Sequence, residues 1–246
     1  PMPLSCIAVI GGGIAGAAAA AGLRRRGAEV VLLEAGTGIG EGASGNRMAL
    51  QSPRLTVDHN AMSRLSAACL SFAARLSDLS GATMARGVLA LDAPERMAAR
   101  HHIFRGQAWP VDLVRAAGPE DLPTRIDESC SAILYPFGRV IRPDMLLPYL
   151  MGDTQLVSGF EVASIDAGED GLLIAAKDGR QRQADAVVLA SGADLGHMVA
   201  LIGELLPLEQ SYGQVSHVPV AAKSLNYELS NGVSFGGYLT LALDGL

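Results

Sequence analysis

The hydrophobic pattern at the start of the chain predicts a strand–helix–strand unit. Residues 6–10 form a short apolar run, typical of a strand buried on both faces. A glycine cluster and an alanine-rich segment follow, and they predict a helix that ends at Gly27. Residues 29–34 form a second apolar run. This order is the usual opening of a doubly wound α/β fold.

Later segments predict one long helix and many short strands. Within 59–79, apolar residues recur at helical spacing, at Met62, Leu65, Ala68, Cys69, Phe72 and Leu76. We expect a strand over 83–92, a helix or turn over 97–107, two strands about a turn at Phe137–Gly138, and a helix from Pro143. Residues 155–192 predict strands with turns at 168–171 and 178–179, ending in a buried strand, and 212–220 and 232–243 predict further strands.

Composition narrows the class of protein. The 246 residues are 49% hydrophobic with a formal net charge of -6, which suits a globular core and gives no overall sign of binding nucleic acid or an anionic membrane. The three cysteines show no metal-like spacing, so we expect buried thiols in a reducing compartment and no metal site. Residues 4–23 carry no charge, but glycines break the stretch, and we expect a cytoplasmic protein without a membrane span.

Gly11, Gly13 and Gly16 form the G-x-G-x-x-G pattern between the first strand and the helix. The first glycine permits the tight turn, the second lets a pyrophosphate approach the backbone, and the third lets helix and strand pack closely. The helix N-terminus offers its free N–H groups to the phosphates. Glu34, at the end of the second strand, is placed to bind ribose hydroxyls. The pattern predicts a dinucleotide but does not choose between FAD and NAD, and a glycine-rich turn without a ligand remains an alternative.

A second glycine-rich stretch, "GTGIGEGASGNR" over 36–47, follows the second strand directly. Its backbone N–H groups can line an extended ligand, and Ser44 and Asn46 add polar contacts. This favours FAD over a plain NAD domain, in which an ordinary helix usually follows. A mobile surface loop is the alternative.

The motifs together resemble a known family. "VIGGGIAG", "LRRRGAEVVLLEAG", "GASGNR", "YPFGRVIRP", "GFEVASI", "ADAVVLASG", "GQVSHVP" and "GGYLT" are similar to the D-amino-acid-oxidase-type FAD oxidoreductases. Within that family, their order is most similar to the oxidoreductase domain of the bifunctional tRNA 5-methylaminomethyl-2-thiouridine biosynthesis proteins. The resemblance runs from about Ile7 to the chain end, and it implies that the family domain continues further and that a fused methyltransferase domain accompanies it, so the chain is expected to be truncated.

The resemblance implies a Rossmann-like FAD-binding domain interleaved with an α+β substrate domain that has a mixed or antiparallel sheet. The expected FAD-binding domain is 1–81 and 149–200, and the expected substrate domain is 82–148 and 201–246. The residues expected to contact FAD are Gly11, Gly13, Ile14, Ala15, Gly16, Glu34, Ala35, Gly42, Ala43, Ser44, Gly45, Asn46, Val162, Ala190, Ser191 and Gly192. Val162 is expected to lie by the adenine through its backbone.

The implied reaction is oxidation of a secondary amine, in which FAD takes a hydride from the carbon beside nitrogen, the imine hydrolyses, and oxygen is the final acceptor. The implied substrate is carboxymethylaminomethyl-uridine in tRNA. Tyr238 and Arg47 are candidates to contact the substrate. The alternative for Tyr238 is a core or rim aromatic, and the alternative for Arg47 is a solvated or phosphate-pairing side chain. His217 is expected to be a hydrogen-bonded structural residue.

Two other functions stay open: oxidation of a small-molecule amine or amino acid, and FAD binding without catalysis. Such amine oxidation needs orientation more than a dedicated acid–base pair. The net charge is unfavourable for tRNA, because RNA binding relies on phosphate neutralisation by Lys and Arg. Two alternatives would supply the positive charge that RNA binding needs: a local basic face of Arg47, Arg54, Arg139 and Arg142, or the family segments expected beyond this chain.

Overall fold

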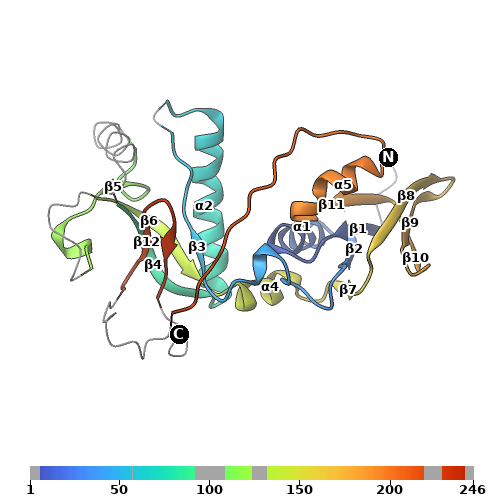
Figure 1. The fold of residues 1–246 in the computed structure, drawn as a ribbon, viewed down its shortest axis with the longest axis horizontal. Coiled ribbons are helices and arrows are strands. Elements are labelled where there is room, and N and C mark those ends of the chain that lie inside the picture. The colour runs from blue at the N-terminus through green and yellow to red at the C-terminus, as the bar shows by residue number, and fades with distance from the viewer. Residues whose placement is uncertain (1–5, 57, 92–108, 124–131, 219–228, 242–246) are drawn as a thin grey trace. The chain divides into compact units, whose positions relative to one another are not determined.

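The computed structural model describes residues 6–56, 58–91, 109–123, 132–218 and 229–241 (Figure 1). The chain divides into two compact units. The first unit is Pro1–Asn46 with Pro143–Gln214, and the second is Arg47–Arg142 with Val215–Leu246. Both are discontinuous, as expected for interleaved domains. Among the described residues, no helix combines the length and the apolar character that a membrane span requires.

The first unit is built on a parallel sheet with strand order β11-β1-β2-β7. Its elements are β1 (Cys6–Ile10), α1 (Ile14–Arg24), β2 (Glu29–Leu33), η1 (Ala43–Gly45), α4 (Pro143–Met151), β7 (Gln155–Val157), β8 (Val162–Gly168), β9 (Gly171–Ala176), β10 (Gln181–Ala184), β11 (Ala186–Leu189), η3 (Gly192–Asp194) and α5 (Leu195–Ala200). The opening strand–helix–strand prediction is confirmed, as are the hairpin turns that join β8, β9 and β10.

Side-chain alternation along β1 explains the layering of the first unit, because successive residues of a strand point to opposite faces. Val9 lies on the side of α1, where a Cβ at Gly16 would come within 3.4 Å of its side chain. Ala8 and Ile10 belong to an apolar cluster with Ile174 of the three-stranded sheet β10-β9-β8. The parallel sheet is therefore packed between α1 and the small antiparallel sheet. Its edge strand β11, expected to be buried, is partly exposed throughout.

The second unit is a mixed sheet with strand order β13-β12-β4-β6-β3, with β5 also paired to β6. Its elements are β3 (Ala49–Gln51), α2 (Ala61–Leu79), β4 (Thr83–Leu91), β5 (Arg115–Ala116), η2 (Pro119–Asp121), β6 (Ala132–Ile141), β12 (Gly232–Ser234) and β13 (Tyr238–Leu239). The expected pair of strands about Phe137–Gly138 is wrong, because β6 is a single strand of ten residues. The strand expected over 212–220 is absent from its described part, 212–218, and the segment 97–107 lies outside the described residues.

Helix α2 is present as predicted, but its orientation is the reverse of the pattern. The side chains of Met62, Leu65 and Phe72 are about 60% exposed. The residues buried on the inner side are Ser63, Leu70, Ala74 and Ser77, with Leu70 in the cluster that contains Val88 and Ile133. Cys69 is exposed rather than buried. The buried face of α2 therefore carries mainly small residues, of which Ser77 donates to Gln51 of β3 and Ser63 accepts from Thr56 N–H, and the larger apolar residues are exposed.

This packing explains where the compact units differ from the expected domains. Residues 47–81 belong to the second unit, because α2 packs on β4 and β6 and β3 pairs with β6. Residues 143–148 belong to the first unit, because α4 packs against α1. The compact units change at 46/47, 142/143 and 214/215, whereas the domain boundaries at 81/82, 148/149 and 200/201 stay a prediction.

Candidate cofactor site

The turn between β1 and α1 is built from glycines that leave no room for side chains. Gly11 has φ +112°, and a Cβ there would lie 2.5 Å from the carbonyl oxygen of Ala190. A Cβ at Gly16 would lie 1.9 Å from the carbonyl oxygen of Gly11. These two glycines serve the fold itself: the first brings the turn against the end of β11, and the third lets α1 close on the turn.

Gly13 differs from its two neighbours in the pattern. A Cβ at Gly13 would meet only Ser44, at 3.2 Å from Oγ, so the fold does not require a glycine there. The glycine instead keeps the space in front of the α1 N-terminus open. This is what a group lying against the backbone would need.

The stretch 36–47 lies over this turn. Gly40 N–H donates to the carbonyl of Gly12 at 3.0 Å, and the Ser44 hydroxyl accepts from Ile14 N–H at 3.0 Å. A Cβ at Gly45 would lie 2.3 Å from the carbonyl oxygen of Gly40. The stretch is therefore hydrogen-bonded to the turn, which does not fit the alternative of a mobile surface loop.

Glu34 ties the two glycine segments together. One carboxylate oxygen accepts from Gly12 N–H and the other accepts from Gly36 N–H at 2.7 Å. An ionised carboxylate has about four acceptor positions, so capacity for a ribose hydroxyl remains. Sequence reasoning missed Gly12, Gly36 and Gly40, because nothing in the spacing distinguishes them from neighbouring glycines.

The β11 end completes the arrangement. Ala190 N–H donates to the carbonyl of Ile10 at 2.8 Å, which places 190–192 beside the β1–α1 turn. The hydroxyl of Ser191 is buried and has no partner among the described residues. A buried hydroxyl without a partner indicates a missing ligand or water.

The segment before β8 reaches the same sheet edge. Phe160 N–H donates to the carbonyl of Glu34 at 2.8 Å, and Gly159 N–H donates to that of Gly36 at 2.7 Å. Val162, at the start of β8, is 3% exposed and packs in the apolar cluster with Ile10 and Leu33. Its side chain is therefore structural, and only its backbone is left for the expected contact.

The residues expected to contact FAD all lie in the first unit, at or near the carboxyl ends of β1, β2 and β11. Ligands of open α/β sheets bind at this edge. Within the described residues, the N–H groups of Gly13, Ala15 and Gly16 donate to no protein acceptor, so the first turn of α1 presents three free amides to an anion. Open space at Gly13, free amides and the unpartnered Ser191 hydroxyl fit a dinucleotide pyrophosphate.

The comparisons with known proteins decide the family. A family model described as FAD dependent oxidoreductase (DAO) matches residues 6–246. The chain belongs to the FAD-dependent oxidoreductase family. FAD is therefore the cofactor of the family, which decides against NAD, and that the turn and the stretch 36–47 hold it stays a prediction.

Relatives of this FAD oxidoreductase include the tRNA 5-methylaminomethyl-2-thiouridine biosynthesis bifunctional protein MnmC of Chromohalobacter salexigens, 32% identical over 99% of this chain and 36% of that protein. The protein of the same name from Aeromonas salmonicida is 32% identical over 96% of this chain and 37% of its own length. The chain thus spans a little over a third of these relatives.

Among solved structures, glycine oxidase from Geobacillus kaustophilus matches with a TM-score of 0.65 and 25% identity, over 80% of this chain and 58% of that one. L-amino acid deaminase from Proteus vulgaris matches with a TM-score of 0.63 at 17% identity, over 84% of this chain and 51% of that one. The second likeness concerns the fold alone.

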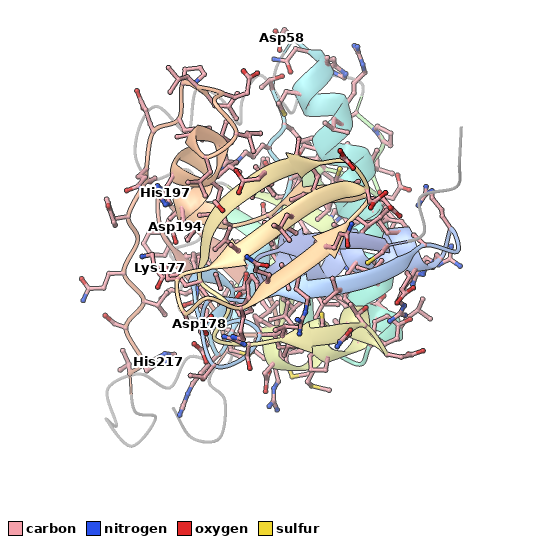
Figure 2. The ribbon with its side chains drawn as sticks, turned by 90° about the vertical axis from the view of Figure 1, so that its right-hand side faces the viewer. Asp58, Lys177, Asp178, Asp194, His197 and His217 are labelled. Atoms are coloured by element: carbon pink, nitrogen blue, oxygen red, sulfur yellow. The ribbon has the colours of Figure 1, made fainter. Side chains whose placement is uncertain are left out.

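The candidate substrate residues lie in the second unit. Arg47 is exposed, directly after the stretch that holds Ser44. Tyr238 is 38% exposed on β13, paired with Ser234. His217, labelled in Figure 2, is exposed and forms no hydrogen bond with any described residue, so its expected structural role is not seen. The part of the chain that the structure covers holds no group of three or more possible metal-binding side chains.

Charge is distributed unevenly between the units. The first unit contains 6 of the 19 basic and 14 of the 25 acidic residues, which gives -8, and the second contains 13 and 11, which gives +2. The acidic balance that argued against RNA is therefore a property of the first unit. Of the expected basic face, however, Arg139 is only 5% exposed and is paired with Asp78.

Proposed function

We propose that the chain is the oxidoreductase part of an enzyme that removes the carboxymethyl group from 5-carboxymethylaminomethyl-(2-thio)uridine in tRNA by oxidising a secondary amine C–N bond. The observation that carries the proposal is the 32% identity to MnmC proteins over nearly the whole chain. The proposal also includes a cytoplasmic location, a fused methyltransferase domain in the complete protein, and molecular oxygen as the final electron acceptor.

In this proposal, the first unit binds FAD. The free amides of Gly13, Ala15 and Gly16 hold the pyrophosphate, Glu34 binds the ribose, and the expected residues of 42–46 and 190–192 line the remaining path. FAD, when bound, supplies the acceptor for the hydride that leaves the carbon beside the substrate nitrogen. The protein supplies binding, orientation and exclusion of water.

Tyr238 and Arg47 are proposed to bind the substrate carboxylate. Two observations support this role: both side chains are exposed, and neither has a hydrogen bond or ion pair with a described residue. A phenol hydroxyl and a guanidinium are both donors to a carboxylate, and an arginine can donate in bidentate fashion. Their contribution is therefore expected in substrate affinity more than in the chemical step.

A small-molecule amine oxidase is the second candidate, supported by the 25% identity to glycine oxidase. The free carboxymethylaminomethyl nucleoside, glycine and sarcosine all contain an amine beside a carboxymethyl or carboxyl group. The two candidates therefore share the reacting bond and differ in what surrounds it.

Anaerobic spectra of the purified flavoprotein separate these functions. We expect the oxidised flavin band to bleach with tRNA that carries the carboxymethylaminomethyl group, and glyoxylate to form in equal amount. The matched control is the same tRNA carrying the aminomethyl group, which has no carboxymethyl carbon to oxidise. Bleaching by glycine or sarcosine but not by the modified tRNA selects the small-molecule function, and a bound flavin that no amine reduces selects binding without catalysis.

Tyr238→Phe should raise KM while changing kcat little.

A further inference from the structure

An aromatic pair lies just before helix α2 in the second unit. The rings of His59 and Trp109 are stacked, with centroids 3.9 Å apart and planes at 14°. Trp109 packs against the apolar cluster of Leu55, Leu70 and Val88. Its indole N–H is buried and has no acceptor among the described residues, so packing and stacking hold the ring. Both residues remain partly exposed.

The backbone holds His59 in a conformation that few residues adopt. Its φ is +50°, and it is the single described non-glycine residue with positive φ. Its N–H donates to the carbonyl of Thr56 at 3.4 Å, and its carbonyl accepts from Arg64 at 2.9 Å. Asn60 then begins α2 by accepting from Ser63 N–H at 2.9 Å. A strained residue held from both sides indicates a position that the surrounding structure fixes.

Positive charge accompanies the stack. The Arg64 guanidinium lies against the His59 carbonyl and uses one of its five donors there. Arg54 is exposed, and its side chain has no hydrogen bond or ion pair with a described residue. Asp58, labelled in Figure 2 near the start of α2, is the one acidic residue within 54–64. The formal balance within 54–64 is therefore positive, as is that of the second unit, and Asp112, three residues after Trp109, is an exposed carboxylate in the segment that carries the other ring of the pair.

We propose that the His59–Trp109 pair, with Arg64 beside it, is a stacking site for an unpaired nucleobase of an RNA chain. Aromatic and imidazole planes with a guanidinium beside them bind unstacked bases of single-stranded RNA loops, and the arginine pairs with the backbone phosphate. The base extends the stack on the outer face of the imidazole. This inference rests on the proposed tRNA function and names a part of the chain that contacts the RNA.

Binding of a fluorescein-labelled RNA hairpin with an unpaired loop, followed by anisotropy, tests the site without any catalytic readout. His59→Gly removes the imidazole, and glycine adopts positive φ without strain. We expect hairpin affinity to fall about tenfold, the effect of losing one stacked base. A fully paired duplex should show no such difference between wild type and variant.

Arg64→Gln separates charge from stacking. We expect weaker hairpin binding and a salt dependence whose slope is shallower by about 0.7, the share of one phosphate on a single strand, whereas His59→Gly should leave the slope unchanged. Arg75→Gln is the matched control, since Arg75 is an exposed arginine of the same helix eleven residues further on, about 16 Å along its axis. Circular dichroism reports folding of each variant, because removal of the stacked imidazole changes the fluorescence of Trp109 directly.

Equal hairpin affinity in wild type and His59→Gly, or no hairpin binding by wild type, overturns the site. Uridine monophosphate that binds as tightly as the hairpin overturns the RNA chain as its source. These outcomes are distinct from failure of the proposed function, because bleaching of the flavin by the modified tRNA is measured separately. A protein that is bleached equally by the modified tRNA in wild type and His59→Gly, and does not bind the hairpin, keeps the function and loses this inference. Hairpin binding that depends on His59, without any oxidation, supports the stacking site and contradicts the proposed function.

Discussion

The cofactor end of the first unit and the end of α2 in the second unit are held by different kinds of hydrogen bonds. In the first unit, the cofactor end is built from main chain: glycine carbonyls and amides meet across the turn, and Glu34 joins two of the amides. In the second unit, the end of α2 is held by side chains. Asp78 accepts from Arg139, Arg86 and Thr83, and Arg139 also donates to the carbonyls of Pro136 and Gly138. The first kind of arrangement is sensitive to added atoms, whereas the second is sensitive to lost charge.

The strongest test of this comparison is Gly16→Val. Its Cβ would lie 1.9 Å from the carbonyl oxygen of Gly11, so the turn cannot close around it. We expect the first unit to lose at least about 3 kcal/mol of stability and to purify without flavin. The matched variant is Gly13→Val, whose Cβ meets only Ser44: it should fold normally but fail to retain FAD. Circular dichroism melting and the flavin absorption band measure the two effects. A Gly13→Val protein with full flavin content contradicts the proposal that the β1–α1 turn binds the pyrophosphate.

Arg139→Met tests the second unit in the same way. It removes a nearly buried guanidinium and leaves the Asp78 carboxylate with Arg86, whose side chain is 63% exposed, and with Thr83. Breaking such a pair should lower the free energy of unfolding by about 3 kcal/mol. Trp109 fluorescence in urea reports this unit.

The control for that experiment is the exposed ion pair of the first unit. Lys177 and Glu161 are 2.6 Å apart with side chains 59% exposed, and Lys177→Met should cost less than about 1 kcal/mol. Equal losses in the two variants would mean that burial does not set the strength of these pairs.

The same contrast explains what the sequence predicts. The cofactor turn depends on local backbone geometry, and its glycine spacing and flanking apolar runs predict β1, α1, β2 and the FAD contacts near them. The orientation of α2 does not follow from its own pattern. The helix buries Ser63, Ala74 and Ser77 and exposes Met62 and Phe72, and two of the buried residues have partners outside the helix, Thr56 for Ser63 and Gln51 for Ser77. Such partners cannot be read from the periodicity of the helix itself. Likewise, the His59–Trp109 stack joins residues fifty positions apart, which no local pattern predicts.

Glu34→Gln tests the side chain that links two backbone amides of the first unit. Glutamine keeps one acceptor oxygen, but its amide nitrogen must face the N–H of Gly12 or Gly36. We expect FAD affinity to fall about tenfold, as one charge-assisted hydrogen bond is lost, while the fold is retained. Titration of apoprotein with FAD measures the change. Glu41→Gln should lower the affinity less, since the Glu41 carboxylate accepts from Thr37 and Gly38 of its own loop and not from the β1–α1 turn.

The smallest expected effect is the pH dependence of the second unit. Burial alone would raise the pKa of Asp78, but the hydrogen bonds from Arg139 and Thr83 outweigh it and hold this pKa below its ordinary value. A carboxyl group with a lowered pKa in the folded state stabilises above its unfolded pKa of about 3.9, and this contribution is lost as the pH falls through the folded pKa. The difference in unfolding free energy between wild type and Asp78→Asn, followed by Trp109 fluorescence, should therefore be constant from about pH 7 to pH 5 and shrink below about pH 4. The guanidinium groups keep their charge throughout this range. A difference that stays constant down to about pH 3 would show that the neighbouring hydrogen bonds and charges do not lower the pKa of Asp78. The conclusion that charged side chains hold the end of α2 in the second unit would then be wrong.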